Sequence, residues 1–123
     1  MSNELALSCS LNYNKNSISL SEIISNLVIT VTGNGLSSLS SFTATTSAVA
    51  IPLGSSTNSG GWVFIQNLDP TNYVQVLTGA AGIVFARVNP GEFCLVRLDA
   101  TVTAPALQAH TASCVVKFCL FDT

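Results

Sequence analysis

The chain has 123 residues, of which 48% are hydrophobic and 8% are charged, and its net charge is −2. This length and hydrophobic content indicate one folded domain with its own core, and they exclude a disordered chain. The four basic residues are scattered one at a time, which argues against nucleic-acid binding because displacement of counterions from phosphates needs clustered positive charge.

The low charge predicts association between copies of the chain. Uncharged polar residues, 16 Ser, 12 Thr and 10 Asn, take most of the role of keeping the surface hydrated. Charge is what keeps like molecules apart, so such a surface is poorly defended against self-association. The N-terminus lacks a signal-peptide pattern and no run of 18 apolar residues occurs, so we expect synthesis in a cytoplasm and no membrane span.

The N-terminal half shows alternating apolar and polar residues, the period of half-buried strands. We expect strands at Glu4–Asn12, Ser17–Leu20 (a short return strand), Asn26–Thr32 and Phe42–Ile51, with a turn at Tyr13–Asn16. Leu20–Ile24 is alternatively a single helical turn. The loop Gly54–Gly61 (GSSTNSGG) has a composition that cannot pack, and it separates the two halves.

The C-terminal half is organised around Gly60–Leu98, which contains the only Trp and half of the six Phe. This stretch predicts a meander of four strands, at Trp62–Asn67, Asn72–Leu77, Ile83–Val88 and Glu92–Leu98. Ala106–Ala112 is weak strand or loop. Ser113–Phe121 is apolar on both faces apart from Lys117, so we expect it at the centre of a sheet or covered by another subunit.

Two turns have a specific chemical prediction. In the turn after Leu68, Pro70 presets φ and the Asp69 carboxylate can accept backbone N–H groups ahead of it. In Asn89–Glu92, Pro90 and Gly91 fit the two central positions of a type II turn.

About eight or nine strands, turn signals every 8–12 residues and no convincing helix predict an all-β fold. A single antiparallel β-sandwich domain of jelly-roll type over residues 1–123 fits this count, with a closed β-barrel as the alternative.

The sequence offers no catalytic constellation. The one histidine, His110, lies in a bland segment without a nucleophile elbow, and Asp69 and Asp99 are better explained as turn residues than as acid–base groups. The four cysteines, Cys9, Cys94, Cys114 and Cys119, lack metal-site spacing and fit buried free thiols. We therefore expect no enzyme, no cofactor and no metal.

Three residues are candidates for glycan or interface contact: Trp62, Tyr73 and Arg97. Trp62 follows the Gly54–Gly61 loop and could stack on a sugar ring, but it shares a strand face with Phe64, which favours a core or interface anchor. Tyr73 lies beside a polar turn. Arg97 shares a face with apolar residues, as a paired or snorkelling charge often does.

Four phrases, NELALSCSLNYNKNSISLS, GWVFIQNLDPTNYVQV, PGEFCLVRLDA and VKFCLFD, resemble small virion-associated structural proteins of tailed bacteriophages. Their shared pattern is an aromatic strand, N-L-D-x-T-N-Y-V and P/A-G-E-x-x-L-x-R-L. Trp62–Phe64, Asn67–Val74 and Pro90–Leu98 match it.

The resemblance implies a β-sandwich present in many copies in a phage particle, as head decoration, capsid cement or a tail or fibre component. The implied partners are copies of itself, with a trimer attractive, and other virion proteins such as the major capsid protein. The alternative function is a carbohydrate-binding or adhesin module that uses Trp62 and the Gly54–Gly61 loop.

Overall fold

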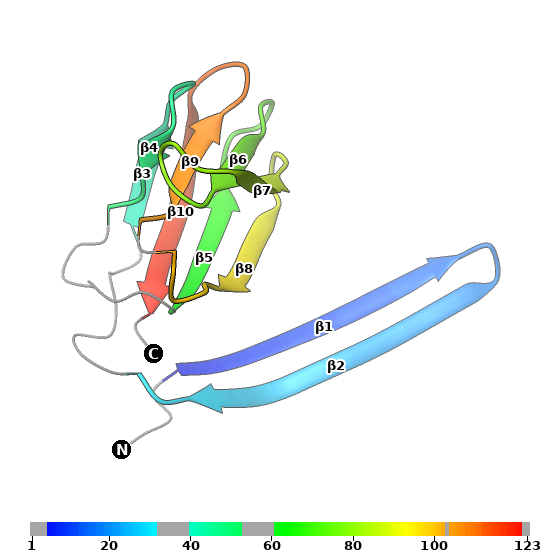
Figure 1. The fold of residues 1–123 in the computed structure, drawn as a ribbon. Helices are drawn as coiled ribbons and strands as arrows, with labels where there is room; N and C mark the ends of the chain where they lie inside the picture. Colours follow the sequence, from blue (N-terminus) through cyan, green and yellow to red (C-terminus); the bar gives the residue numbers. More distant parts are fainter. Residues whose placement is uncertain (1–4, 32–39, 53–60, 103, 122–123) are drawn as a thin grey trace. The chain divides into compact units, whose positions relative to one another are not determined.

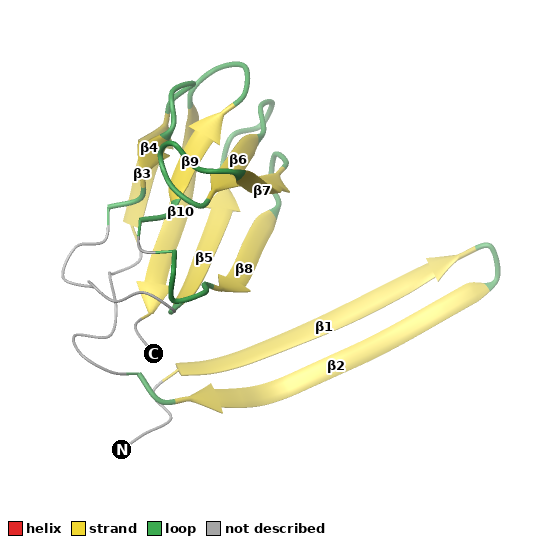
Figure 2. Ribbon diagram, viewed as in Figure 1, coloured by secondary structure: helices red, strands yellow, loops and turns green. Residues whose placement is uncertain are grey.

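The computed structural model describes residues 5–31, 40–52, 61–102 and 104–121. The chain divides into two compact units, Met1–Val31 and Thr32–Thr123. The described residues form strands, turns and loops without a helix (Figure 2), and so no helix among them could cross a membrane.

The first unit is a two-stranded antiparallel hairpin, here called the arm, made of β1 (Leu5–Lys15) and β2 (Ile18–Ile29) (Figure 1). The second unit contains eight strands: β3 (Ser40–Ala44), β4 (Val49–Ala50), β5 (Trp62–Asn67), β6 (Val74–Leu77), β7 (Val84–Val88), β8 (Phe93–Arg97), β9 (Ala106–Ala109) and β10 (Cys114–Phe121).

These eight strands form two four-stranded antiparallel sheets, ordered β3-β10-β5-β8 and β4-β9-β6-β7. Successive strands cross from one sheet to the other at every connection except β6 to β7. This is the strand order of a jelly roll, as the sequence predicts. Both sheets are open, with β3 and β8 at the edges of one and β4 and β7 at the edges of the other, so the closed-barrel alternative is wrong.

The core of the sandwich consists of the inward-facing residues of both sheets. Alternation along each strand places every second side chain in this core. The central strands supply most of the fully buried residues: Val63, Ile65, Val74, Val76, Leu107, Val116 and Leu120. Phe42 of β3 packs edge-on against Phe118 of β10, with ring centroids 5.5 Å apart.

The strand β10 pairs with β3 on one side and β5 on the other, so the prediction of a central position for Ser113–Phe121 is confirmed. The predicted type II turn is also confirmed. The Glu92 N–H donates to the Asn89 carbonyl oxygen (3.0 Å), and Gly91 has φ of +79°.

The predicted meander is wrong in its pairing, although its four strands exist. β5 pairs with β8 and β10, while β6 pairs with β7 and β9 in the other sheet. The predicted single strand Phe42–Ile51 is likewise two strands, β3 and β4, that belong to different sheets. The chain bends between them, where the Thr45 hydroxyl donates to the Ser47 carbonyl oxygen (2.9 Å) and the Thr45 carbonyl accepts the Ala109 N–H (2.8 Å).

Residues 5–29 differ most from the predicted local structure. Instead of a short strand, a turn and a helical alternative at Leu20–Ile24, the arm has strands of 11 and 12 residues. The tight turn consists of Asn16 and Ser17, both with positive φ (53° and 65°), the signature of a type I′ hairpin turn. The sequence assigns residues 1–123 to one sandwich domain; the sandwich strands lie in the second unit, and β1 and β2 pair only with each other.

Candidate interaction surfaces

The arm has one apolar face that continues along its length. Directly opposed residues of an antiparallel pair share a face, and the register pairs Cys9 with Ile24 and Tyr13 with Leu20. The apolar face of the arm, as we use the term, contains Leu5, Leu7, Cys9, Leu11, Tyr13, Ile18, Leu20, Ile24, Leu27 and Ile29. Two charged residues lie on the same side, Glu22 opposite Leu11 and Lys15 opposite Ile18. The other face of its outer part contains Ser10, Asn12, Asn14, Ser19 and Ser21, with Ile23 as the exception.

A β-bulge keeps this face continuous. In β2 the apolar positions change from even numbers (Leu20, Ile24) to odd numbers (Leu27, Ile29), which in a regular strand would place them on opposite faces. The register shifts between Leu7 and Cys9, where Ser8 faces two residues of β2, and Asn26 takes positive φ (60°). The Asn26 N–H donates to the Ser8 hydroxyl (3.1 Å). The extra residue returns the later apolar side chains to the same face.

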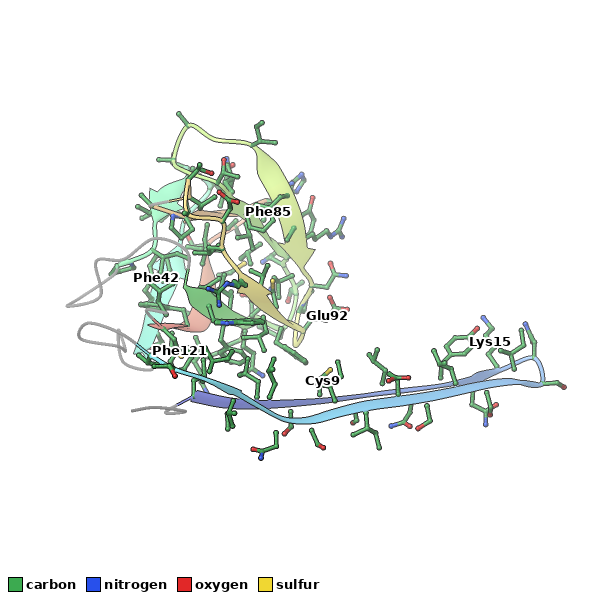
Figure 3. The ribbon with its side chains drawn as sticks, turned by 60° about the horizontal axis from the view of Figure 1, so that its bottom comes forward. Cys9, Lys15, Phe42, Phe85, Glu92 and Phe121 are labelled. Atoms are coloured by element: carbon green, nitrogen blue, oxygen red, sulfur yellow. The ribbon has the colours of Figure 1, made fainter. Side chains whose placement is uncertain are left out.

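The outer part of the arm exposes its apolar face in the single chain. Leu11 is 58% exposed, Ile18 60% and Leu20 55%. Figure 3 shows Cys9 and Lys15 on the same side of the hairpin, as the register requires. An isolated two-stranded hairpin is marginally stable in water. An exposed apolar face of this kind is a candidate interaction surface.

A second apolar surface lies on the outer side of the sheet β3-β10-β5-β8. The register places Trp62 between Arg97 and Phe121, and Phe64 between Leu95 and Cys119. We call this surface the aromatic face and define it as Trp62, Phe64, Phe93, Leu95, Cys119 and Phe121 (Phe121 is labelled in Figure 3). The rings of Phe64 and Phe93 lie 6.1 Å apart, and Phe93 is 64% exposed.

Trp62 and Arg97, two of the candidate residues, are cross-strand neighbours on this sheet. Trp62 is half-buried, and its indole Nε1 is buried without a hydrogen-bond partner among the described residues. Trp62 and Phe64 share the outer face, as the sequence predicts. Most of the Gly54–Gly61 loop lies outside the described residues.

Tyr73, the third candidate, lies with the opposite sheet. It precedes β6, and its ring stacks on His110 (centroids 4.7 Å apart), while the Arg87 guanidinium carbon lies 3.6 Å from the ring centroid. Arg87 and His110 belong to the strands on either side of β6, or adjoin them. The structure therefore does not bring Tyr73 together with Trp62 and Arg97, and its ring already has partners within the chain. No pattern in the sequence points to this stack, because Arg87 and His110 become neighbours of Tyr73 only through pairing of the sheet.

The N-L-D-P-T-N-Y-V segment, residues Asn67–Val74, stabilises the connection between β5 and β6 through hydrogen bonds. Asn67 is fully buried, and its side-chain amide donates to the carbonyl oxygens of Asn72 (2.8 Å) and Val88 (3.1 Å) and accepts the Asp69 N–H (2.9 Å). The Asp69 carboxylate accepts the N–H groups of Thr71 and Asn72, as the sequence predicts. These hydrogen bonds hold the pKa of Asp69 below its ordinary value.

The four cysteines are free thiols. Cys114 and Cys119 are buried and Cys94 is half-buried, and burial raises the pKa of each of these three thiols. Cys9 differs from the prediction of buried thiols, because it lies exposed on the apolar face of the arm. Among the described residues, no group of three or more His, Cys, Asp or Glu side chains is placed to hold a metal ion.

Comparison of the chain with models of protein families, with curated proteins and with solved structures finds no match.

Proposed function

We propose that this chain is a structural protein of a tailed-phage particle, which works by associating with copies of itself and with other virion proteins. The observation that supports this most is the exposed apolar face of the arm. Ten apolar residues from two strands form this face, and Leu11, Ile18 and Leu20 of its outer part are each more than half exposed. The proposal assigns the chain no catalytic step.

The energetics favour a partner for this face. Apolar surface removed from water contributes about 25 cal/mol per Å², and a two-stranded hairpin alone buries little of it. Association would supply the arm with the packed layer that it lacks. The low content of charged residues, 8%, leaves little electrostatic repulsion between copies to oppose such contacts.

The assignment to a phage particle depends on the resemblance of the four phrases quoted above. A jelly roll fits this class, because viral capsid proteins use that architecture, but lectin domains use it too. The fold by itself therefore does not choose between the functions, and the arm is the feature that favours assembly.

Two measurements test the proposal. Sedimentation of the purified chain over a range of concentrations should show an oligomer, and mass spectrometry of purified particles should find the chain among the virion proteins. A chain that stays monomeric at high concentration and is missing from particles would refute it.

One observation favours glycan binding as a second candidate. A hollow of about 390 Å³, lined by Arg97, Leu98, Asp99 and Ala100, lies at the end of β8, where Arg97 is the cross-strand neighbour of Trp62. Under this proposal, Trp62→Ala abolishes binding on a glycan array and leaves the circular dichroism spectrum unchanged. Absence of binding by the native chain on a broad array would rule it out.

A further inference from the structure

We infer that the aromatic face, together with two cations on the same side of its sheet, binds an acidic polysaccharide. The inference goes beyond the proposed role in assembly, which uses the arm, and it narrows the glycan candidate to chains with sparse carboxylates. Three properties of the outer side of the sheet β3-β10-β5-β8 carry it. They are exposed aromatic rings, uncharged hydrogen-bonding groups, and positive charge without a counter-charge.

The aromatic rings form a hydrophobic platform beside polar groups. Phe93 is 64% exposed, and its ring lies 6.1 Å from that of Phe64. Gln66 is the cross-strand neighbour of Phe93 in β8 and of Lys117 in β10. Ser41 lies opposite Lys117 in β3 and is exposed. A sugar ring has C–H groups on its flat faces and hydroxyl groups around its rim, so an aromatic surface beside amide and hydroxyl groups is suited to it.

The positive charge on this side of the sheet is unmatched. The strands of the sheet contain two basic residues, Arg97 and Lys117, and no carboxylate. The register places Arg97 beside Trp62 and Lys117 beside Gln66, so both lie on the outer side. Neither makes an ion pair with another residue of the part of the chain that the structure describes. In a chain of net charge −2, this side of the sheet therefore favours an anion.

The two carboxylates that flank β8 accept hydrogen bonds within their own turns. Glu92 accepts the Asn89 N–H (3.2 Å), and Asp99 accepts the backbone N–H and the hydroxyl of Thr101 (2.9 and 2.8 Å). The Asp99 carboxylate lines the same hollow as Arg97. Because these donors partly offset the two negative charges, the cations of the sheet remain to pair with an external anion.

The spacing of the two cations selects a polymer of low charge density. Arg97 and Lys117 are four residues apart along the strands and two strands apart across the sheet. At about 3.4 Å per residue and 4.8 Å per strand, their Cα atoms are about 17 Å apart. A nucleic-acid strand has one phosphate per about 3.4 Å, so about five phosphates would cover this distance and most would meet no cation. A polysaccharide with a carboxylate on every second or third sugar avoids that excess charge.

Binding of a defined acidic oligosaccharide to the full-length chain tests the inference. The probe is a hyaluronan hexasaccharide, which has a carboxylate on every second sugar, and chitohexaose is the uncharged control of the same length. Isothermal titration calorimetry should show that chitohexaose binds at least about 10-fold more weakly than hyaluronan. Because the contact is partly ionic, the affinity for hyaluronan should fall as the NaCl concentration rises from about 50 to 500 mM.

Substitutions on the sheet separate the ionic part of the contact from the aromatic part. Arg97→Gln and Lys117→Gln should each weaken hyaluronan binding by about 2- to 5-fold, the range of an exposed ion pair, and the double variant should lose the salt dependence. Arg97→Lys keeps the charge and should retain that dependence. Phe93→Ala should weaken binding by about 2- to 10-fold and leave the salt dependence unchanged.

Matched controls exclude general effects of these substitutions. Arg87→Gln and Phe85→Ala remove an exposed cation and an exposed ring from β7 of the other sheet, and both variants should bind hyaluronan like the native chain. Leu20→Asp alters the arm, so it should change assembly and leave the affinity per chain unchanged. Thermal unfolding followed by circular dichroism checks that each variant is folded.

The other outcomes overturn the inference in recognisable ways. No binding of hyaluronan at about 1 mM, or equal binding of chitohexaose, would remove the acidic polysaccharide as the ligand. Tighter binding of an oligothymidylate, a Glu-rich peptide or phosphatidylserine vesicles would assign the face to that ligand instead.

The test also separates this inference from the proposed assembly. If Phe93→Ala and Arg97→Gln weaken self-association and do not affect hyaluronan binding, the aromatic face is a contact between copies, and the inference fails while the proposed function stands. A native chain that stays monomeric but binds hyaluronan through these two residues would support the inference and refute the assembly.

Discussion

Replacement of Asn67 should destabilise the sandwich more than any other single polar substitution in the described turns. The Asn67 side chain is fully buried and makes three hydrogen bonds, to the Asn72 carbonyl, the Val88 carbonyl and the Asp69 N–H. Because Asn67 ends β5 and Val88 ends β7, one of these bonds joins the two sheets.

The magnitude follows from these three bonds. A buried hydrogen bond contributes about 1 kcal/mol net, and partners left unsatisfied in the interior raise the loss, so Asn67→Ala should reduce the free energy of unfolding by about 3 kcal/mol. For a domain of 60–100 residues this lowers the melting temperature by roughly 12–24 °C. Asn67→Asp should be at least as damaging at neutral pH, because a carboxylate cannot donate to the two carbonyl groups.

The assay is urea denaturation followed by Trp62 fluorescence, with all chains at one concentration because assembly contributes to apparent stability. Asn14→Ala is the control, since Asn14 is exposed on the polar face of the arm. The Asp variant should recover part of its lost stability on acidification, when the protonated group can donate. If Asn67→Ala were no more destabilising than Asn14→Ala, the structural role assigned to this side chain would be wrong.

Three other predictions concern a turn, the acid stability and the thiols. Gly91→Ala should lose about 1 kcal/mol of unfolding free energy, because Gly91 has φ of +79°. Gly79→Ala is the control and should be close to neutral, because the added Cβ would meet its nearest atom at 3.8 Å. Equal effects of the two substitutions would contradict the turn assignment. Hydrogen bonds from Asn72 and Thr71 lower the pKa of Asp69, and bonds from Thr101 lower that of Asp99. These carboxylates therefore contribute stability that is complete above a pH of about 4 and is lost as the pH falls through their folded pKa values. Asp69→Asn should therefore make the free energy of unfolding less dependent on pH in the acid range. An unchanged pH dependence in this variant would refute the prediction. Iodoacetamide should modify Cys9 first in dilute protein. The other three thiols, Cys94, Cys114 and Cys119, are shielded by burial, which also raises their pKa. Peptide mapping that finds Cys114 modified first would contradict the described burial. At concentrations where copies associate, the reaction of Cys9 should slow.

The sequence by itself determined the local structure of most of this chain. Runs of apolar, β-branched and aromatic residues bounded by turn residues located β5 and β10 within about a residue of their observed bounds, and the Pro90–Gly91 pair specified a type II turn. These features depend on neighbours in sequence, so a single sequence contains the information. The count of strands and the absence of helical patterns also sufficed for the all-β sandwich.

Only the tertiary structure decided which strands lie side by side. Alternation says which residues share a face, but the partner of a strand can lie far along the chain, and so β5 and β6 were expected as neighbours although they belong to different sheets. The same limit applies to the candidate residues: Trp62 and Arg97 become neighbours through pairing of β5 with β8, while Tyr73 stacks between groups of the other sheet.

The arm shows this limit most clearly. Its apolar positions change parity along β2, which in the sequence looks like a break between two short elements. The bulge at Ser8 and Asn26 restores them to one face, and that depends on the register of two strands and on a positive φ at one residue. The apolar residues were visible in the sequence, but their union into one exposed surface required the pairing of β1 with β2.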